Sequence, residues 1–491
     1  MYRRIVLFSL FLLHFALSLR SDDSQPNPWG FPADRPDFDA ATLLATGLPL
    51  VEVTTVDGEE LRCDFVSHPE GAMGRSITNA NTVGGRIVIR SKAEGVLYDS
   101  GSYIEAFSGA TFRLRGNTSV WWGHRSIKVA LQQKGDLITC EQSVFANKHW
   151  LLLGTGPWLD LMVGLKVNEL IGMEWTPRWQ FVNLMINGSY QGIYSIVEQV
   201  RRDPVSRINV DRFGGYLIEC DPYWWNEPLY VRTALMHKDF TFKYPESEDV
   251  TTAQQDYVLR SLNELETAIE DGTYEEHIDV PSFARWLLAH DILGTFDSGG
   301  SNMFLAKQDE SSESKWRMPC LWDFGSILRC ENRWARVHDN FFYYAPLFAS
   351  PNNLFARTYN KIWEEERTRI FSEMRSFLYD FRASELFEAL ERSHDLDRQR
   401  YDYEDPTTAE EVSTFLDWFL TRETWMAEAM KAYKPDDVVP TAIEHRSVQR
   451  AARFSEFDLL GRPSSGRGGF VVTSKGVFLT AKKPQLRQQP R

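Results

Sequence analysis

Three polar residues in the middle of the chain have the types and the spacing that phosphoryl transfer requires. Asp297 is followed five residues later by Asn302, and Asp323 opens an Asp-Phe-Gly sequence further along. Protein kinases place a catalytic base and two magnesium ligands in this order. Because phosphoryl transfer asks the protein for positioning and charge neutralisation, these few groups would be enough to define an active site.

Each of these three side chains has a definite role in this interpretation. Mg²⁺ prefers oxygen ligands in near-octahedral geometry, which the carboxylate of Asp323 and the amide of Asn302 can supply. Asp297 would accept the proton of the hydroxyl group that receives the phosphoryl group. Each motif alone also occurs in ordinary turns, so the prediction depends on their order along the chain.

A nucleotide site also needs a cation near the α- and β-phosphates. Lys128, in the alternating segment 126–131, is the best candidate, and the alternative is a solvated lysine on a strand. Its acidic partner would lie on the helix predicted at 158–171. Asp160 and Glu169 are both candidates for that partner.

Glu198 follows a predicted β-hairpin. Segments 181–186 and 190–197 alternate with strand period around Asn187-Gly188, which is a strong turn signal. Glu198 ends the second strand, where the chain should cross between two lobes. It could help to shape an adenine pocket, or it could cap an exposed strand end.

The pattern of the chain changes from strands to helices. Residues 48–200 are rich in alternating segments, and residues 201–435 are mostly helical. We expect segments 303–307 and 315–321 to form a β-hairpin that carries the metal ligands. The other predicted strands and helices include strands at 51–56, 85–89, 111–115 and 126–131, and helices at 158–171, 252–270 and 281–293. The sequence therefore predicts an α+β protein with a β-rich N-terminal lobe, a mostly helical C-terminal lobe and a nucleotide between them.

The two ends of the chain differ from this pattern. Residues 1–20 combine an Arg-Arg pair with an apolar stretch, which indicates a signal peptide, and residues 21–47 indicate a polar, Pro-rich linker. Residues 436–491 form a basic tail. Its short β segments resemble sorting signals of some Gram-negative secreted proteins, and a flexible basic tail is the alternative. We therefore expect export to the periplasm, the cell surface or the medium.

The composition excludes some functional classes. A formal net charge of −14 argues against binding to the phosphate backbone of nucleic acids. Beyond the N-terminal stretch, no segment is long and apolar enough to predict a transmembrane helix. The five cysteines have no zinc-site spacing. Cys320 and Cys330 could bracket Asp323 as a disulfide, but scattered buried thiols are the interpretation that the chain length favours.

Several motifs together resemble the CotH family, the spore-coat kinase-like proteins. Residues 115–121 read R-G-N-T-S-V-W, like the family signature R-G-N-S/T-S/T-x-W. Residues 186–200 resemble the family's v-N-G-x-Y-x-G-x-Y-x-l-x-E-q-v, and residues 213–219 resemble its G-G-y-l-x-E. Residues 297–302 with Trp322-Asp323 match its D-x-x-x-x-N…W-D core.

The resemblance extends over about residues 48 to 345. It implies an atypical protein-kinase-like fold, ATP with Mg²⁺ or Mn²⁺, and transfer of the γ-phosphoryl group to hydroxyl groups of a protein substrate. It gives Asp297 and Asp323 their catalytic and metal-binding roles, and Lys128 a role at the nucleotide.

One departure from the family pattern supports an alternative function. Gly325 stands where the family often has the second Asp of W-D-x-D, so the active site could be weakened. The alternative is a non-catalytic cell-surface protein on the same, pseudokinase-like fold, which binds glycans or proteins. The pairs at 121–122 and 224–225 are both Trp-Trp, and they could stack on sugars or pack inside the protein.

Overall fold

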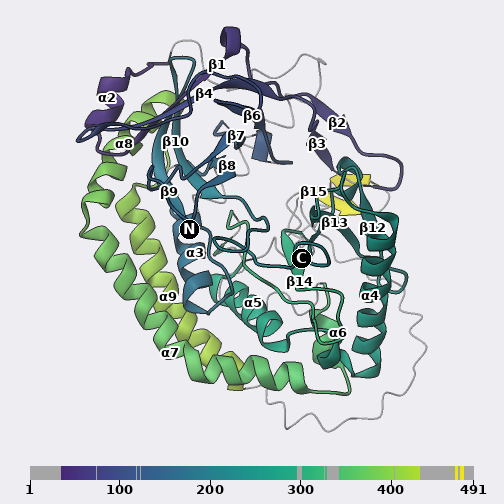
Figure 1. Ribbon diagram of the computed structural model, residues 1–491. Coiled ribbons are helices and arrows are strands. Elements are labelled where there is room, and N and C mark those ends of the chain that lie inside the picture. Colours follow the sequence, from purple (N-terminus) through teal and green to yellow (C-terminus); the bar gives the residue numbers. More distant parts are fainter. Residues whose placement is uncertain are drawn as a thin grey trace, which may run out of the picture. The chain divides into compact units, whose positions relative to one another are not determined.

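The computed structural model describes residues 35–431, except 73, 118, 122, 157, 296–300, 326, 329–341 and 403, together with the backbone of 470–473 and 476–479 (Figure 1). The predicted signal peptide, Asp297, Cys330 and most of the basic tail lie outside the described residues.

The chain divides into two compact units, and each unit is assembled from separate stretches of sequence. The first, here called the barrel unit, comprises Met1–Pro157, Arg178–Gln199 and Glu385–Thr408. The second, here called the helical unit, comprises Trp158–Pro177, Val200–Ser384 and Ala409–Arg491. The domain limits expected from the sequence, at residues 47, 200 and 435, stay predictions.

The barrel unit is built on a closed β-barrel. Within the described residues, strands pair in the order β1-β9-β10-β8-β7-β6-β4, and pairing of β4 with β1 closes the ring. Strands β1 and β9 are parallel, and β5 is attached to β4. The barrel strands are β1 (Leu50–Thr55), β4 (Val83–Ser91), β5 (Gly95–Asp99), β6 (Ala110–Leu114), β7 (Ile127–Gly135), β8 (Asn147–Leu153), β9 (Trp179–Ile186) and β10 (Ser189–Glu198). A separate ribbon pairs β2 (Phe65–Ser67) with β3 (Arg75–Ile77).

The apolar core of this unit follows from strand alternation. Side chains along a strand point to opposite faces, so every second residue can enter the barrel. Along β6, for example, Ala110, Phe112 and Leu114 are buried, and the two residues between them are half-exposed. The expected β-rich character is confirmed. The closed barrel was not expected, and it is not clearly the N-terminal lobe of a kinase.

Helix α8 (Glu385–Tyr401) belongs to the barrel unit although it lies about 190 residues beyond β10 in the chain. It runs beside β10 (Figure 1). Arg400 Nε donates to the carbonyl of Tyr190 at 3.1 Å, and Asn183 Nδ2 donates to Ser393 Oγ at 3.2 Å. The short helix α2 (Ala40–Ala45) packs against β1.

The helical unit combines a four-stranded antiparallel sheet with the long helices of the described chain. The sheet order is β12-β13-β11-β14. Its strands are β11 (Tyr216–Cys220), β12 (Tyr230–Arg232), β13 (Asp239–Tyr244) and β14 (Met303–Lys307). Its helices are α3 (Asp160–Leu170), α4 (Thr252–Asp271), α5 (Val280–Leu293), α6 (Tyr344–Ala349), α7 (Leu354–Arg382) and α9 (Thr408–Lys431). Strands β15 (Phe470–Thr473) and β16 (Gly476–Leu479) pair only with each other.

Local signals explain where these helices begin. Thr251 and Gln254 form a reciprocal capping box at the start of α4. The carboxylate of Asp279 accepts a hydrogen bond of 2.8 Å from the backbone of Ser282 at the start of α5. Helix α5 is buried along almost its whole length and packs against α3 and α7. The helices predicted from periodicity are therefore confirmed.

The predicted hairpin of 303–307 and 315–321 is formed only in part. Strand β14 pairs along its length with β11. The returning segment contributes one antiparallel bridge, in which Ala306 and Arg317 exchange backbone hydrogen bonds of 2.8 and 2.9 Å. Beyond this bridge the segment bonds to α3 and the turn after it, so the second strand is not completed.

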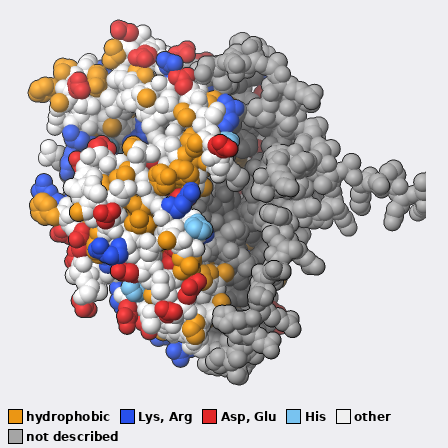
Figure 2. Space-filling model, turned by 90° about the vertical axis from the view of Figure 1, so that its right-hand side faces the viewer, with side chains coloured by type: hydrophobic (Ala, Val, Ile, Leu, Met, Phe, Trp, Pro, Cys, Tyr) orange, Lys and Arg blue, Asp and Glu red, His pale blue; other side chains and the backbone are white. Residues whose placement is uncertain are grey.

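The surface and the helices bear on two further expectations. On the face that Figure 2 views, acidic and basic side chains are interspersed over the described residues. The expectation that the protein does not bind nucleic acid stays a prediction. No helix among the described residues is long and apolar enough to cross a membrane.

Candidate functional site

Two of the predicted metal ligands meet in the helical unit. Asn302 immediately precedes β14, and Asp323 follows the segment that returns from that strand. Nδ2 of Asn302 donates a hydrogen bond of 3.1 Å to Oδ2 of Asp323. The fold therefore brings together two side chains that were predicted to be metal ligands.

Both residues have a left-handed backbone. The φ angle is 56° at Asn302 and 63° at Asp323. Residues with a Cβ disfavour this region, although Asn and Asp tolerate it better than most. Such conformations concentrate at functional sites, where the surrounding structure holds them in place.

The oxygens of this pair suit a divalent cation. Asp323 is exposed, and its Oδ1 accepts a hydrogen bond of 3.2 Å from the backbone of Gly325. Nδ2 of Asn302 also lies 3.3 Å from Ser301 Oγ. Mg²⁺ is commonly held by one or two protein groups together with substrate phosphates. The carboxylate and amide oxygens are therefore of the type that Mg²⁺ or Mn²⁺ binds, and their role as metal ligands stays a prediction.

The segment that leads to Asp323 is fixed by α3 and the turn after it. The backbone N–H of Leu321 donates to Oδ1 of Asn168 at 2.7 Å. The backbone N–H of Trp175 donates to the carbonyl of Pro319 at 3.1 Å. Both bonds are made by groups that a regular hairpin would have directed to a partner strand.

The segment that leaves Asp323 is fixed by the end of α5. The backbone N–H of Leu328 donates to the carbonyl of Leu293 at 2.9 Å. Leu328 has a φ angle of 61°, which is unusual for a bulky side chain. The loop around Asp323 is therefore held on both sides by helices of its own unit.

Lys128 lies on β7 of the barrel unit. It is half-buried and pairs with Arg113 on β6 and Leu151 on β8. Asp297 lies outside the described residues. The nucleotide role of Lys128 and the base role of Asp297 stay predictions.

Glu198, the predicted adenine-pocket residue, is fully buried at the end of β10. Its Oε2 accepts the backbone N–H of Arg178 at 3.0 Å, and its Oε1 accepts Nε and Nη2 of the same residue at 3.1 and 3.0 Å. These bonds tie the start of β9 to the end of β10. The carboxylate therefore has a structural use, and its contact with a nucleotide stays a prediction.

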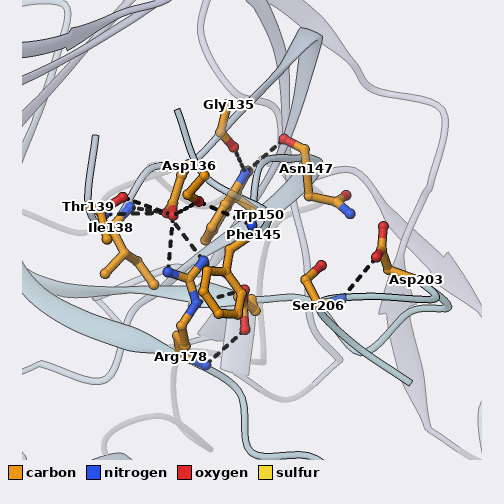
Figure 3. A network of polar contacts seen from close by, with 12 residues as sticks. Gly135, Asp136, Ile138, Thr139, Phe145, Asn147, Trp150, Arg178, Asp203 and Ser206 are labelled. Atoms are coloured by element: carbon orange, nitrogen blue, oxygen red, sulfur yellow. Dashed lines mark hydrogen bonds and ion pairs between the residues drawn. The ribbon is translucent and has the colours of Figure 1, made fainter. Parts of the chain in front are cut away.

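Arg178 also binds a second buried carboxylate. Its Nη1 lies 3.0 Å from Oδ2 of Asp136, and the ring of Phe145 lies over the guanidinium group at 3.9 Å (Figure 3). Burial would raise the pKa of Asp136, but the hydrogen bonds from Arg178, Ser143 and Thr139 outweigh it and hold that pKa below its usual value. Sequence reasoning missed this network because no spacing links its members.

A second charged cluster lies on the sheet of the helical unit. Lys243 Nζ lies 2.9 Å from Oε2 of Glu219 and 3.8 Å from Oε1 of Glu227. Burial, together with the charge of Glu219, raises the pKa of Asp221 to about 7, and Lys243 opposes the change. Burial would lower the pKa of Lys243, but the surrounding carboxylates raise it overall. Glu219 belongs to the G-G-y-l-x-E motif, and that motif was the sequence signal for this cluster.

The described cysteines do not form disulfides. Cys63, Cys140, Cys220 and Cys320 are thiols that are not part of a disulfide. Burial raises the pKa of Cys320 well above its usual value. Among the described residues, no group of three or more His, Cys, Asp or Glu side chains is arranged to hold a metal ion.

Comparison with known families supports the resemblance seen in the motifs. The model of the family described as CotH kinase protein matches residues 159–426, which is more than half of the 491 residues. The match includes Glu198, Asn302 and Asp323, while Lys128 and the motif at 115–121 precede it. A comparison with curated proteins gave no match. The chain belongs to the CotH kinase protein family.

Proposed function

We propose that this protein is an exported atypical protein kinase that transfers the γ-phosphoryl group of ATP to hydroxyl groups of a protein substrate. The supporting observation is the hydrogen-bonded pair of Asn302 and Asp323, in which both backbones are left-handed. Membership of the CotH kinase protein family is the second support.

The proposed reaction assigns one task to each predicted residue. Mg²⁺ or Mn²⁺ would neutralise the charge of the β- and γ-phosphates when bound. Asp323 and Asn302 would hold this cation, and Lys128 would contact the α- and β-phosphates. The acceptor oxygen bonds to the γ-phosphorus as the bond from that phosphorus to the ADP oxygen breaks, and Asp297 takes the hydroxyl proton.

Gly325 is compatible with this proposal. The residue replaces the second carboxylate of the family motif, but its backbone N–H binds Oδ1 of Asp323 at 3.2 Å. Its contribution is therefore to orient the remaining carboxylate. A second carboxylate is dispensable where phosphates and water complete the coordination of Mg²⁺.

Thermal unfolding with ATP and Mg²⁺ or Mn²⁺ tests the proposal. A ligand at one hundred times its Kd stabilises the folded state by about 2.7 kcal/mol, so the wild type should gain several degrees in Tm. Asp323→Ala and Asn302→Ala should lose most of this metal-dependent gain. Labelled ATP with a generic protein acceptor should show transfer by the wild type only.

Asp211→Ala is a matched control for Asp323→Ala. Asp211 is also an exposed carboxylate of the helical unit, and it accepts backbone hydrogen bonds of 2.8 and 2.9 Å from Phe213 and Gly214. This control should retain the nucleotide response of the wild type. A wild type without any metal-dependent response to ATP would refute the kinase proposal.

The second candidate function is non-catalytic binding at the cell surface. The observation in its favour is Gly325, which removes a carboxylate of the family motif. Trp224, one of the proposed sugar-stacking residues, is half-buried and lies against the ring of Tyr230 and the guanidinium of Arg232, at 4.3 and 4.9 Å. Glycan-array binding that survives Asp323→Ala, without phosphoryl transfer by the wild type, would favour this candidate.

The proposed location follows from the two ends of the chain. Residues 1–20 would direct export, and residues 436–491 would act as a sorting segment or a basic tail. Fractionation of cells that express the full chain, or the chain without residues 1–20, tests this directly. Retention of both proteins inside the cell would contradict export.

A further inference from the structure

The ring of Phe324 lies directly on the backbone of α3. A Cβ atom added at Gly164 would be 2.0 Å from Cδ1 and 2.2 Å from Cγ of Phe324. Only 3% of Phe324 is exposed. Glycine inside a helix costs about 1 kcal/mol relative to alanine, so its presence here calls for a packing reason. The reason is the close approach of this ring.

Asn168 lies one helical turn after Gly164, on the same face of α3. It is fully buried, and its Oδ1 accepts the backbone N–H of Leu321 at 2.7 Å. Its Nδ2 donates to the carbonyl of Trp175 at 2.9 Å and to Thr176 Oγ1 at 2.7 Å. Because both ends of the amide are bonded, its orientation is fixed.

We propose that Gly164 and Asn168 form a seat on α3 that positions the carboxylate of Asp323. The seat holds Leu321, two residues before Asp323, and Phe324, one residue after it. Gly164 and Asn168 are therefore positioning residues, and neither would contact the metal ion or the nucleotide. That the carboxylate of Asp323 binds a metal ion rests on the proposed function.

The seat explains how the strained loop persists. A left-handed Asp is retained only where its neighbours leave the chain no relaxed alternative. Trp322 and Phe324, on either side of Asp323, are both buried, at 6% and 3% exposure, whereas Asp323 itself is exposed. The two buried rings turn the intervening carboxylate outward, toward Asn302.

Gly164→Ala tests the seat in the metal-free protein. The new methyl group must displace the ring of Phe324, so amide hydrogen exchange in residues 321–325 should accelerate on the order of tenfold. With Mn²⁺ and ATP, the Kd should rise on the order of tenfold, since the carboxylate is no longer held in place. Lys166→Ala is the control, because Lys166 lies on the same helix and contacts Glu169 and Phe377 instead.

A double mutant separates the seat from general damage to the helix. In a Phe324→Ala background there is no ring to displace, so Gly164→Ala should have a much smaller effect on exchange. Asn168→Ala should accelerate exchange at Leu321, whose N–H loses its acceptor. Circular dichroism and cooperative unfolding identify any variant that does not fold.

The outcomes are distinguishable. The seat would be refuted if amide hydrogen exchange is unchanged in Gly164→Ala. It would also be refuted if Gly164→Ala has the same effect on exchange with Phe324 and with Ala at position 324. Faster exchange with an unaltered Kd would overturn its positioning role. A wild type that does not bind the metal–nucleotide pair would refute the proposed function, while the exchange data would still decide whether α3 seats the loop.

Discussion

The side-chain amide of Asn302 donates a 3.1 Å hydrogen bond to the carboxylate of Asp323, and both residues have positive φ angles. The motifs that contain Asn302 and Asp323 are separated along the chain by β14 and the segment that returns from it, and the fold brings them together in one small polar site. The chain accepts left-handed backbone at both positions, where glycine would be less strained. This choice of residues is expected where the side chains bind a ligand.

Replacement of Asn302 should separate backbone strain from side-chain function. Asn302→Gly relieves the left-handed conformation, whereas Asn302→Ala keeps it and also lacks the amide. We expect the glycine variant to be more stable than the alanine variant by about 1 kcal/mol, from urea unfolding. Both variants should lose the metal-dependent response to ATP. Equal stability of the two variants would show that the left-handed backbone at position 302 is not strained.

Two glycines of the β9–β10 hairpin form a matched pair. A Cβ at Gly192 would lie 2.5 Å from Nε2 of His124 and 2.6 Å from Oδ2 of Asp397, whereas a Cβ at Gly188 would meet nothing within 4 Å. Both glycines have positive φ angles, 102° and 81°. Gly192→Ala should therefore lower the free energy of unfolding by about 2 kcal/mol more than Gly188→Ala.

The same comparison tests the buried pair of His124 and Asp397. Their side chains lie 2.9 Å apart, and the carboxylate also accepts the backbone N–H of Ile193 at 2.6 Å. Chemical denaturation measures the free energy of unfolding of both glycine variants. Similar losses of free energy in the two variants would show that the side chains of this pair move aside to accommodate the new methyl group.

Removal of Arg178 should strongly destabilise the barrel unit. Arg178→Ala removes the positive charge that faces the buried carboxylates of Asp136 and Glu198, and losing one partner of a buried ion pair costs about 3–5 kcal/mol. Arg178→Lys retains the charge but cannot bind both carboxylates with a planar fork, so its loss should be intermediate. Denaturant unfolding measures both variants.

Arg260→Ala is the control for this prediction. Its salt bridge with Glu264 is exposed and 4.0 Å long, so we expect a loss below about 0.5 kcal/mol. A loss in Arg178→Ala no larger than in this control would contradict the structural role of the network.

Asp221 should make stability depend on pH. Its pKa is about 7 in the folded protein, against a usual value of 3.8, so the folded state binds the proton more tightly than the unfolded state. Its contribution to stability is therefore present at low pH and is lost as the pH rises through about 4 to 7. Asp221→Asn should flatten this part of the curve and still accept the backbone N–H of Tyr223, which lies 2.8 Å from the wild-type carboxylate.

Urea unfolding at a series of pH values measures this effect. Above about pH 7 the Asp221→Asn variant should be more stable than the wild type, because an ionised, desolvated carboxylate has been removed. A variant that is less stable than the wild type at every pH would show that Lys243 compensates the charge fully.

The sequence by itself determined the local elements and the order of the chemistry. Strand alternation predicted β6 and β7, and the Asn187-Gly188 turn predicted the β9–β10 hairpin, because these signals depend on neighbouring residues only. Helical periodicity likewise predicted α4. The order of Asn302 and Asp323 was enough to identify both as ligand candidates, and several motifs together suggested the family.

Only the tertiary structure decided which distant residues meet. Closure of the barrel joins β1 to β4 and draws in β9, and the seat on α3 pairs Gly164 with Phe324, 160 positions later. No periodicity encodes these contacts, since each depends on the entropy of loop closure and on the packing of whole elements. The second strand of the predicted hairpin is incomplete for the same reason, because its backbone groups bond to α3 and the turn after it instead of to β14.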